Sequence, residues 1–83
     1  MEISTIKKMI EDGLECTYVQ VDGDGSHFFA KVVSHAFDGL SVIKQHKKVY
    51  ATLGDKVGGE IHAFSVQTYT PDAWEKAKKL LIT

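Results

Sequence analysis

The side chains in this sequence best suited to metal or acid–base chemistry are four histidines and a single cysteine. His27 directly follows a loop that contains Asp22 and Asp24, and His62 precedes an alternating apolar run. Neutral imidazole is a common ligand for iron and other transition metals. Cys16 is the only thiol, so the chain can form neither an internal disulfide nor a metal site made of cysteines alone. The lone cysteine fits a reducing compartment.

The remaining reactive side chains have simpler explanations. His35 is predicted in a loop and His46 on a helix face, where histidines usually have no specific role. Cys16 is expected to be a small apolar residue at the start of a strand. Asp22 and Asp24 are explained by turn chemistry, and no spacing brings a nucleophile, a base and an orienting acid together. The sequence therefore predicts a protein that is not an enzyme.

Charge and length limit the function further. Eleven acids against ten bases give a net charge of −1, and every base is lysine. Because arginine is the side chain best shaped for phosphate and guanine, nucleic-acid binding is disfavoured but not excluded. Residues 1–13 lack the apolar run of a signal peptide or membrane span, which predicts a cytoplasmic protein with no membrane contact. We expect a single domain over residues 1–83, which gains stability from a partner, a metal or a homodimer contact.

Hydrophobic spacing in the first half predicts a helix followed by a β-hairpin. Isoleucines recur at helical spacing up to Gly13, which is predicted to be a C-cap. Strands are predicted over 16–21 and 27–33, joined by the Asp-Gly steps of residues 22–26. Alternation puts one set of apolar residues on the core face: Val19, Val21, Phe28, Ala30 and Val32.

The second half predicts a helix, a strand and a final helix. The middle helix is expected to have Ser41 as its N-cap, to end at Gly58-Gly59, and to bury a stripe of Leu40, Ile43, Tyr50, Leu53 and Val57. A third strand over 61–69 can then lie parallel to the second through a right-handed crossover. Thr70-Pro71 is typical of a helix start, and Trp74 leads the inward stripe of that helix, with Ala77 or Lys78 and Leu81. The predicted order is αββααβα or αββαβα.

Five sequence blocks in this order resemble the BolA family, over about residues 3 to 78. They are Asp24-Gly25-Ser26-His27-Phe28, Phe37-Asp38-Gly39-Leu40-Ser41, Val49-Tyr50, Ile61-His62-Ala63-Phe64-Ser65, and Thr68-Tyr69-Thr70-Pro71 with Trp74. The loop before His27 is most similar to the IbaG (YrbA) branch of that family. The resemblance implies an α+β fold akin to the class II KH domain, with a three-stranded mixed sheet and helices packed on one side.

The resemblance also implies a function. Proteins of this family partner a monothiol glutaredoxin and share a [2Fe-2S] cluster, so a role in cluster handling or redox-linked regulation is expected. His62 matches the family's characteristic histidine, and His27 matches a histidine-or-cysteine position in the first hairpin loop. The other ligands would come from the glutaredoxin and from glutathione, and no cofactor is expected in the isolated protein.

The predicted sheet bears on whether the two histidines can act together. If the second and third strands are adjacent and parallel, His27 and His62 lie at the same end of the sheet. Simple alternation, however, puts His62 on the face of Phe64 and Val66 and puts His27 on the opposite face. The glycine-rich loop beside His27 would then have to re-aim its ring.

Two alternatives remain open. A transcription-associated nucleic-acid binder would use the KH-like fold and the lysines of the middle helix, Lys44, Lys47 and Lys48. KH modules clamp nucleic acid with a Gly-x-x-Gly loop, whereas this chain has only Gly39 at the corresponding turn. The third reading is an interaction domain in which the histidines have no special role.

Overall fold

The computed structural model describes residues 2–59, 61 and 63–81, and among these it shows a three-stranded sheet with helices around it. The helices are α1 (Ile3–Gly13), α2 (Val42–Leu53) and α3 (Pro71–Leu81), with short 3-10 turns η1 (His35–Phe37) and η2 (Gly54–Lys56). The strands are β1 (Cys16–Gly23), β2 (His27–Ser34) and β3 (Ala63–Tyr69). This order confirms the predicted α+β class. The 3-10 turn η1 lies where the predicted order αββααβα has a second helix between the second and third strands.

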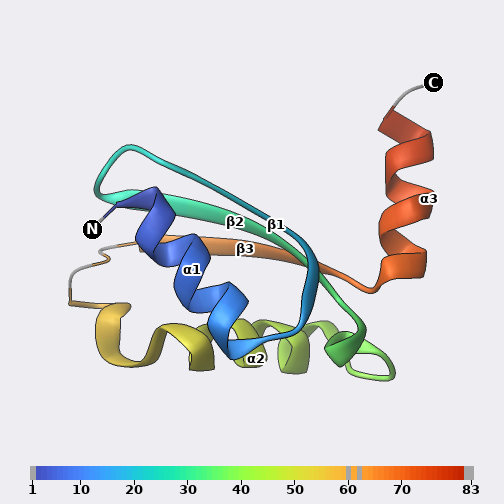
Figure 1. Cartoon of the computed structure of the whole chain (residues 1–83), viewed down its shortest axis with the longest axis horizontal. Coiled ribbons are helices and arrows are strands. Elements are labelled where there is room, and N and C mark those ends of the chain that lie inside the picture. The colour runs from blue at the N-terminus through green and yellow to red at the C-terminus, as the bar shows by residue number, and fades with distance from the viewer. Residues whose placement is uncertain (1, 60, 62, 82–83) are drawn as a thin grey trace.

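The sheet is mixed, as predicted. Its strand order is β1-β2-β3, with β1 antiparallel to β2 and β2 parallel to β3. Figure 1 shows α1 and α2 beside the sheet, the β1–β2 hairpin at one end and α3 beyond the other end. The crossover from β2 to β3 therefore runs through α2.

One face of the sheet, which we call the core face, packs against α1 and α2. Alternation along the strands places the predicted apolar residues here, since strand side chains point to opposite faces in turn. The buried cluster joins them to both helices, and its members are Ile6, Ile10, Val19, Val21, Phe28, Ala30, Val32, Phe37, Val49, Leu53 and Ile61.

The predicted stripe of α2 is partly wrong. Ile43 is 69% exposed, whereas Gln45 is buried together with Val49 and Leu53. The amide of Gln45 is satisfied there, because its Nε2 donates to the carbonyl of Leu40 (3.0 Å) and its Oε1 accepts from the Thr68 hydroxyl (2.7 Å). These bonds let a polar side chain occupy a core position and fix the rotation of α2.

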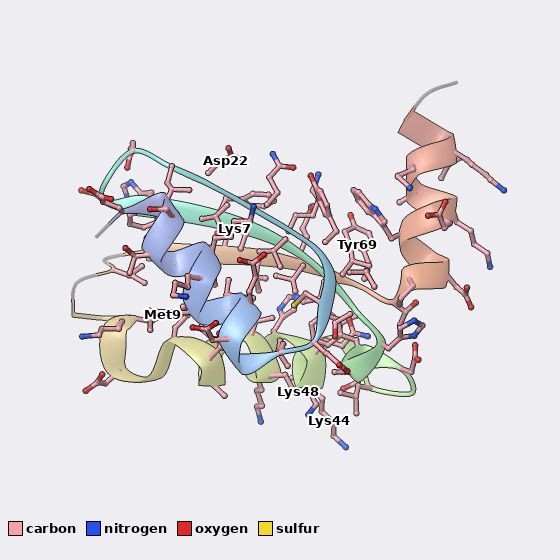
Figure 2. All side chains as sticks on the ribbon, in the orientation of Figure 1. Lys7, Met9, Asp22, Lys44, Lys48 and Tyr69 are labelled. Carbon is pink, nitrogen blue, oxygen red and sulfur yellow. The ribbon has the colours of Figure 1, made fainter. Side chains whose placement is uncertain are left out.

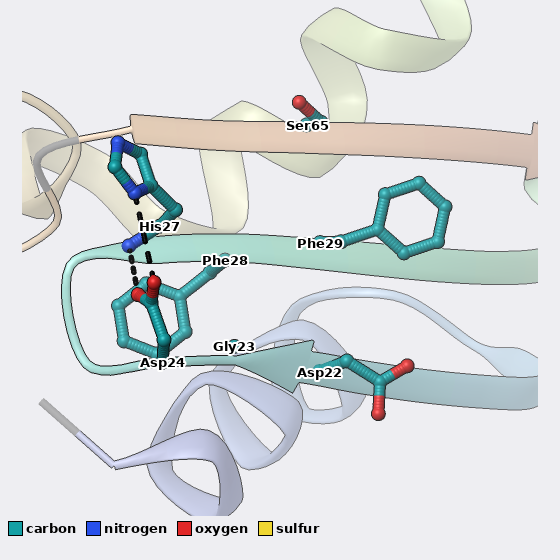
Figure 3. A pocket seen from close by; sticks show the side chains of 7 residues that line it. All are labelled: Asp22, Gly23, Asp24, His27, Phe28, Phe29 and Ser65. Atoms are coloured by element: carbon teal, nitrogen blue, oxygen red, sulfur yellow. Dashed lines mark hydrogen bonds and ion pairs between the residues drawn. The ribbon is translucent and has the colours of Figure 1, made fainter.

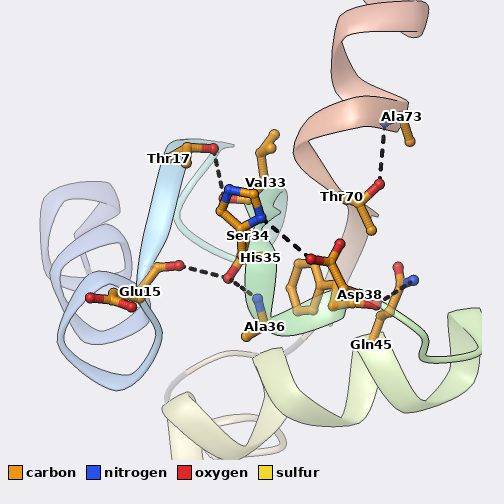
Figure 4. Close-up of polar contacts among 11 residues, drawn as sticks. Glu15, Thr17, Val33, Ser34, His35, Ala36, Asp38, Gln45, Thr70 and Ala73 are labelled. Carbon is orange, nitrogen blue, oxygen red and sulfur yellow. Dashed lines mark hydrogen bonds and ion pairs between the residues drawn. The ribbon is translucent and has the colours of Figure 1, made fainter.

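Two predicted helix ends also differ. α2 ends at Leu53 and not at Gly58-Gly59, and its C-cap is Gly54, which has a φ of +59°. Gly13 does not adopt a positive φ. A Cβ at Gly13 would lie 2.6 Å from Cγ2 of Thr52, so glycine is needed for the close approach of α1 to α2 and not for a cap. The predicted start of α3 is confirmed, since the backbone N–H of Ala73 donates to the Thr70 hydroxyl at 3.2 Å (Figure 4).

α3 departs from the expectation that the helices pack on one side. Its Trp74 ring lies 5.2 Å from the rings of both Tyr18 and Tyr69, which point away from the core face. Because the indole contacts these two rings, α3 packs against the opposite face, at the end of the sheet. None of the described helices is long and apolar enough to cross a membrane.

Candidate functional site

The loop between β1 and β2 is built around the carboxylate of Asp24. Its Oδ1 accepts the backbone N–H groups of Ser26 (3.0 Å) and His27 (2.8 Å), and its own backbone N–H donates to the carbonyl of His27 (3.2 Å). Gly25 completes the turn with a φ of +99°. The N–H of His27, followed by that of Ser26, lowers the pKa of Asp24 below its usual value, because both bonds favour the charged carboxylate.

The same carboxylate faces the His27 ring. Nδ1 of His27 lies 3.8 Å from Oδ2 of Asp24, an ion-pair separation longer than a hydrogen bond, and both side chains are well exposed. Figure 3 shows the second ring nitrogen pointing away from Asp24. A metal-bound histidine usually donates its second ring N–H to a carboxylate, and Asp24 lies on that side of the His27 ring, although too far away for a hydrogen bond.

The end of β2 that carries His27 lies next to the start of β3. His27 pairs in register with Ala63, and the N–H of Ala63 donates to the carbonyl of Ser26 at 3.2 Å. The predicted parallel pairing of these strands is therefore confirmed. His62, the predicted metal ligand that precedes Ala63 in the chain, lies outside the described residues.

A shallow, open hollow of about 400 Å³ adjoins His27 (Figure 3). Asp22, Phe29 and Ser65 contribute to it from three adjacent strands and lie in one register row across the sheet. It combines carboxylates, an imidazole and a half-buried aromatic ring on a surface open to a partner. Sequence reasoning assigned Asp24 to the turn alone; its position three residues before His27 was the available sign that it also faces the ring.

Cys16 is not part of this site. It pairs with Ser34 at the opposite end of β2 from His27. Its half-buried position, with a contribution from Glu11, raises the pKa of the thiol. A thiol held protonated is a poor metal ligand and a poor nucleophile, which agrees with its predicted inert role.

The three lysines suggested for partner or nucleic-acid contact lie on α2. Lys44, Lys47 and Lys48 are all exposed. In Figure 2, Lys44 and Lys48 project from α2 away from the sheet, at the opposite edge of the view from Asp22. α2 covers the core face, so these lysines and the His27 site do not form one surface.

His35 and His46 do not add ligands to the site. His35 Nδ1 lies 3.3 Å from Oδ2 of Asp38 within η1 and the turn after it (Figure 4). His46 is half-buried on α2. Within the described parts of the chain, no three His, Cys, Asp or Glu side chains are grouped so that they could hold a metal ion.

Comparisons with known proteins agree on one family. The family model for BolA-like proteins matches residues 6–73. The acid stress protein IbaG of Escherichia coli K12 is 38% identical over 96% of each chain. The solved structure of a BolA homologue from Coxiella burnetii has a TM-score of 0.77 at 38% identity, covering 90% of this chain and 97% of its own. Yeast Fra2 has a TM-score of 0.74 at 28% identity, covering 96% and 90%.

Proposed function

The chain belongs to the BolA family, and from that premise we propose that it is an adaptor that binds a monothiol glutaredoxin and shares a [2Fe-2S] cluster with it. It would act in iron–sulfur cluster handling or in redox-linked regulation. The observation that carries this proposal is the exposed His27 imidazole, held beside Asp24 at the end of the parallel β2–β3 pair.

The donor set suits one part of a shared site. Histidine replaces cysteine on one iron in some [2Fe-2S] centres, so an imidazole is a chemically sound ligand. The described residues bring no other imidazole or thiolate to His27, and Cys16 lies at the far end of β2. Completion of the cluster by glutaredoxin and glutathione ligands is consistent with this limited set.

The chain's own residues would prepare one nitrogen for binding. The Asp24 carboxylate lies 3.8 Å from Nδ1 of His27, and the other ring nitrogen faces away from it (Figure 3). His62, as the family's characteristic histidine, is the proposed second imidazole. A protonated imidazole cannot bind iron, so acid would weaken the shared cluster. The Escherichia coli relative is named an acid stress protein. On the basis of this chemistry, we propose that this chain also acts under acid stress.

The test is a titration of the purified protein into cluster-loaded monothiol glutaredoxin, followed by visible circular dichroism. The wild-type protein should change the spectrum of the cluster, and His62→Ala and His27→Ala should each weaken the change. His46→Ala, on α2, is the matched control and should behave as wild type. Iron and sulfide analysis of the co-expressed complex gives an independent measurement. Absence of any spectral change with the wild-type protein would refute the cluster role.

A second candidate function is nucleic-acid binding through α2. The observation in its favour is that Lys44, Lys47 and Lys48 are all exposed on one helix, close after the turn at Gly39, which has a φ of +75°. Such binding would weaken steeply with salt, since lysine contacts release counterions from the phosphates. A mobility-shift titration at several salt concentrations, with Lys47→Gln as the variant, tests it, and a flat salt dependence would exclude it.

A further inference from the structure

The face of the sheet that points away from α1 and α2, which we call the open face, has an ordered set of side chains. The pairing of β1, β2 and β3 arranges them in three rows across the strands. The first row lies beside His27, and the third lies next to α3. From first to third, the rows are Asp22, Phe29 and Ser65; Gln20, Lys31 and Gln67; and Tyr18, Val33 and Tyr69.

An aromatic cluster covers the third row. The indole of Trp74 stacks on Tyr18 with ring centroids 5.2 Å apart and an interplanar angle of 16°. It also meets Tyr69 at 5.2 Å, and Nζ of Lys31 lies 5.6 Å from its ring centroid. Val33, between the two tyrosines in register, is fully buried. This end of the open face is therefore a packed aromatic cluster, in which Tyr18 remains 39% exposed.

Charge divides the open face into two ends. Asp22 and Asp24 make the end near His27 acidic, and both are exposed. Lys31, in the second row, makes the part of the face next to the aromatic cluster basic, together with α3, which carries three lysines against two acids. Lys78 of α3 lies 6.0 Å from the Trp74 ring centroid and also pairs with Glu75 at 2.9 Å. The surface thus changes sign along the strands.

The size of this face matches one partner. His27 and Val33 are six residues apart along β2, which corresponds to about 20 Å of extended strand. A specific protein interface covers roughly 800 Å² on each partner, a patch somewhat wider than that length. An interface of this size that includes His27 is large enough to reach the aromatic cluster.

We propose that the protein partner that completes the His27 site lies across the whole open face, with the Tyr18, Tyr69 and Trp74 cluster as its second area of contact. This inference rests on the proposed function. It assigns the partner a basic surface opposite Asp22 and Asp24 and an acidic surface opposite Lys31. Because phosphates carry one sign of charge throughout, the acidic end disfavours a nucleic acid on this face.

Nuclear magnetic resonance tests the location directly. The chain contains one tryptophan, so a ¹⁵N-labelled sample gives one indole N–H signal, and tryptophans of an unlabelled partner stay silent. Adding cluster-free monothiol glutaredoxin should shift the Trp74 indole and the amides of Lys31 and Gln67. The amides of Lys44 and Lys47 on α2 should stay in place.

The outcomes separate this inference from the proposed function. Shifts on α2 with an unchanged open face would overturn the open-face assignment and leave glutaredoxin binding intact. No shift anywhere, with or without cluster, would refute both. Shifts of the open face caused by a mixed-sequence single-stranded oligonucleotide, and not by glutaredoxin, would overturn the choice of a protein partner.

Two variants add a quantitative test. Lys31→Glu reverses the charge of the basic end and should weaken glutaredoxin binding by about tenfold, whereas Lys47→Glu on α2 should leave it unchanged. Since Lys31 also contacts Trp74, Ser65→Arg provides a second change, at an exposed residue of the first row. It should weaken binding by at least as much while leaving the free indole signal in place. Wild-type affinity in both variants would contradict the proposal.

Discussion

The core face and the open face belong to the same three strands but meet different demands. On the core face, Val21, Ala30 and Val66 pack beneath α1 and α2, and their types follow from burial alone. The residues next to them in the chain, Asp22, Lys31 and Ser65, lie on the open face, and core packing requires none of the three. The face that stabilises the fold was therefore readable from alternation. The face that can recognise a partner was visible only once the strands were paired.

Adjacent phenylalanines provide the strongest test of this comparison. Phe28 is 3% exposed on the core face, whereas Phe29 is half-buried on the open face. Phe28→Ala should lower the free energy of unfolding by about 3–5 kcal/mol, because it leaves a cavity in a close-packed core. Phe29→Ala removes less buried surface and should cost about 1 kcal/mol. Urea denaturation measures both.

The size of the domain calls for a milder companion variant. A loss of this size approaches the total stability of a small domain, so Phe28→Ala could unfold outright. Phe28→Leu should retain the fold at a cost of about 1 kcal/mol or somewhat more. Equal losses from Phe28→Ala and Phe29→Ala would show that the two faces do not differ in packing.

Gln45 sharpens the comparison because it is a polar residue on the core side. Gln45→Ala leaves the carbonyl of Leu40 and the hydroxyl of Thr68 without their partner. We expect a loss of about 1–3 kcal/mol, the cost of buried polar groups left unsatisfied. Gln67→Ala, at an exposed position of the open face, is the matched control and should change stability by no more than about 0.5 kcal/mol. Similar losses of unfolding free energy in the two variants would show that the hydrogen bonds of Gln45 do not stabilise the fold.

Trp74 tests how α3 is held. Trp74→Ala removes the contacts with Tyr18 and Tyr69 and should cost about 1–2 kcal/mol. Because these contacts tie α3 to the sheet, amide hydrogen exchange should accelerate in α3 while α1 stays protected. Trp74→Phe should retain part of the protection. Unchanged exchange in α3 would mean that other contacts hold the helix.

The errors made from sequence have a common physical cause. Strand alternation and the Thr70-Pro71 helix start were predicted because both depend on residues close together in the chain. The exposure of Ile43 was missed because the rotation of α2 depends on Gln45 meeting Thr68, a strand away. The position of α3 was missed because Trp74 finds Tyr18 on the first strand. Gly13 was misread for the same reason, since Thr52 on another helix requires it.

The site shows the same division between local and tertiary information. The sequence alone shows that His27 follows an Asp-Gly loop and on which face of its strand it lies. The row beside it depends on the pairing of three strands, since it consists of Asp22, Phe29 and Ser65. Periodicity within one strand carries no information on its register with the next.

The smallest expected effect is a dependence of the unfolding free energy on pH, which should appear for a variant in the loop before His27 and not for a variant on the core face. The backbone N–H groups of His27 and Ser26 lower the pKa of Asp24 in the folded protein, so folding favours its carboxylate form. The stability from this turn is complete above the pKa of an unfolded aspartate, about 3.9, and is lost as the pH falls through the lower folded value. Asp24→Asn retains an acceptor oxygen but cannot titrate. The gap in unfolding free energy between wild type and Asp24→Asn should therefore shrink as the pH falls below about 4.

The core face supplies the control for this titration. Phe28→Leu changes only apolar packing, so its gap from wild type should stay constant over the same pH range. Urea denaturation at a series of pH values measures both gaps under identical conditions. If the Asp24→Asn gap is also constant, the carboxylate charge does not stabilise the loop that orients His27, and the turn depends on its hydrogen-bond geometry alone. If it shrinks, protonation of Asp24 loosens the loop that carries His27, whereas the packing of the core face is unaffected.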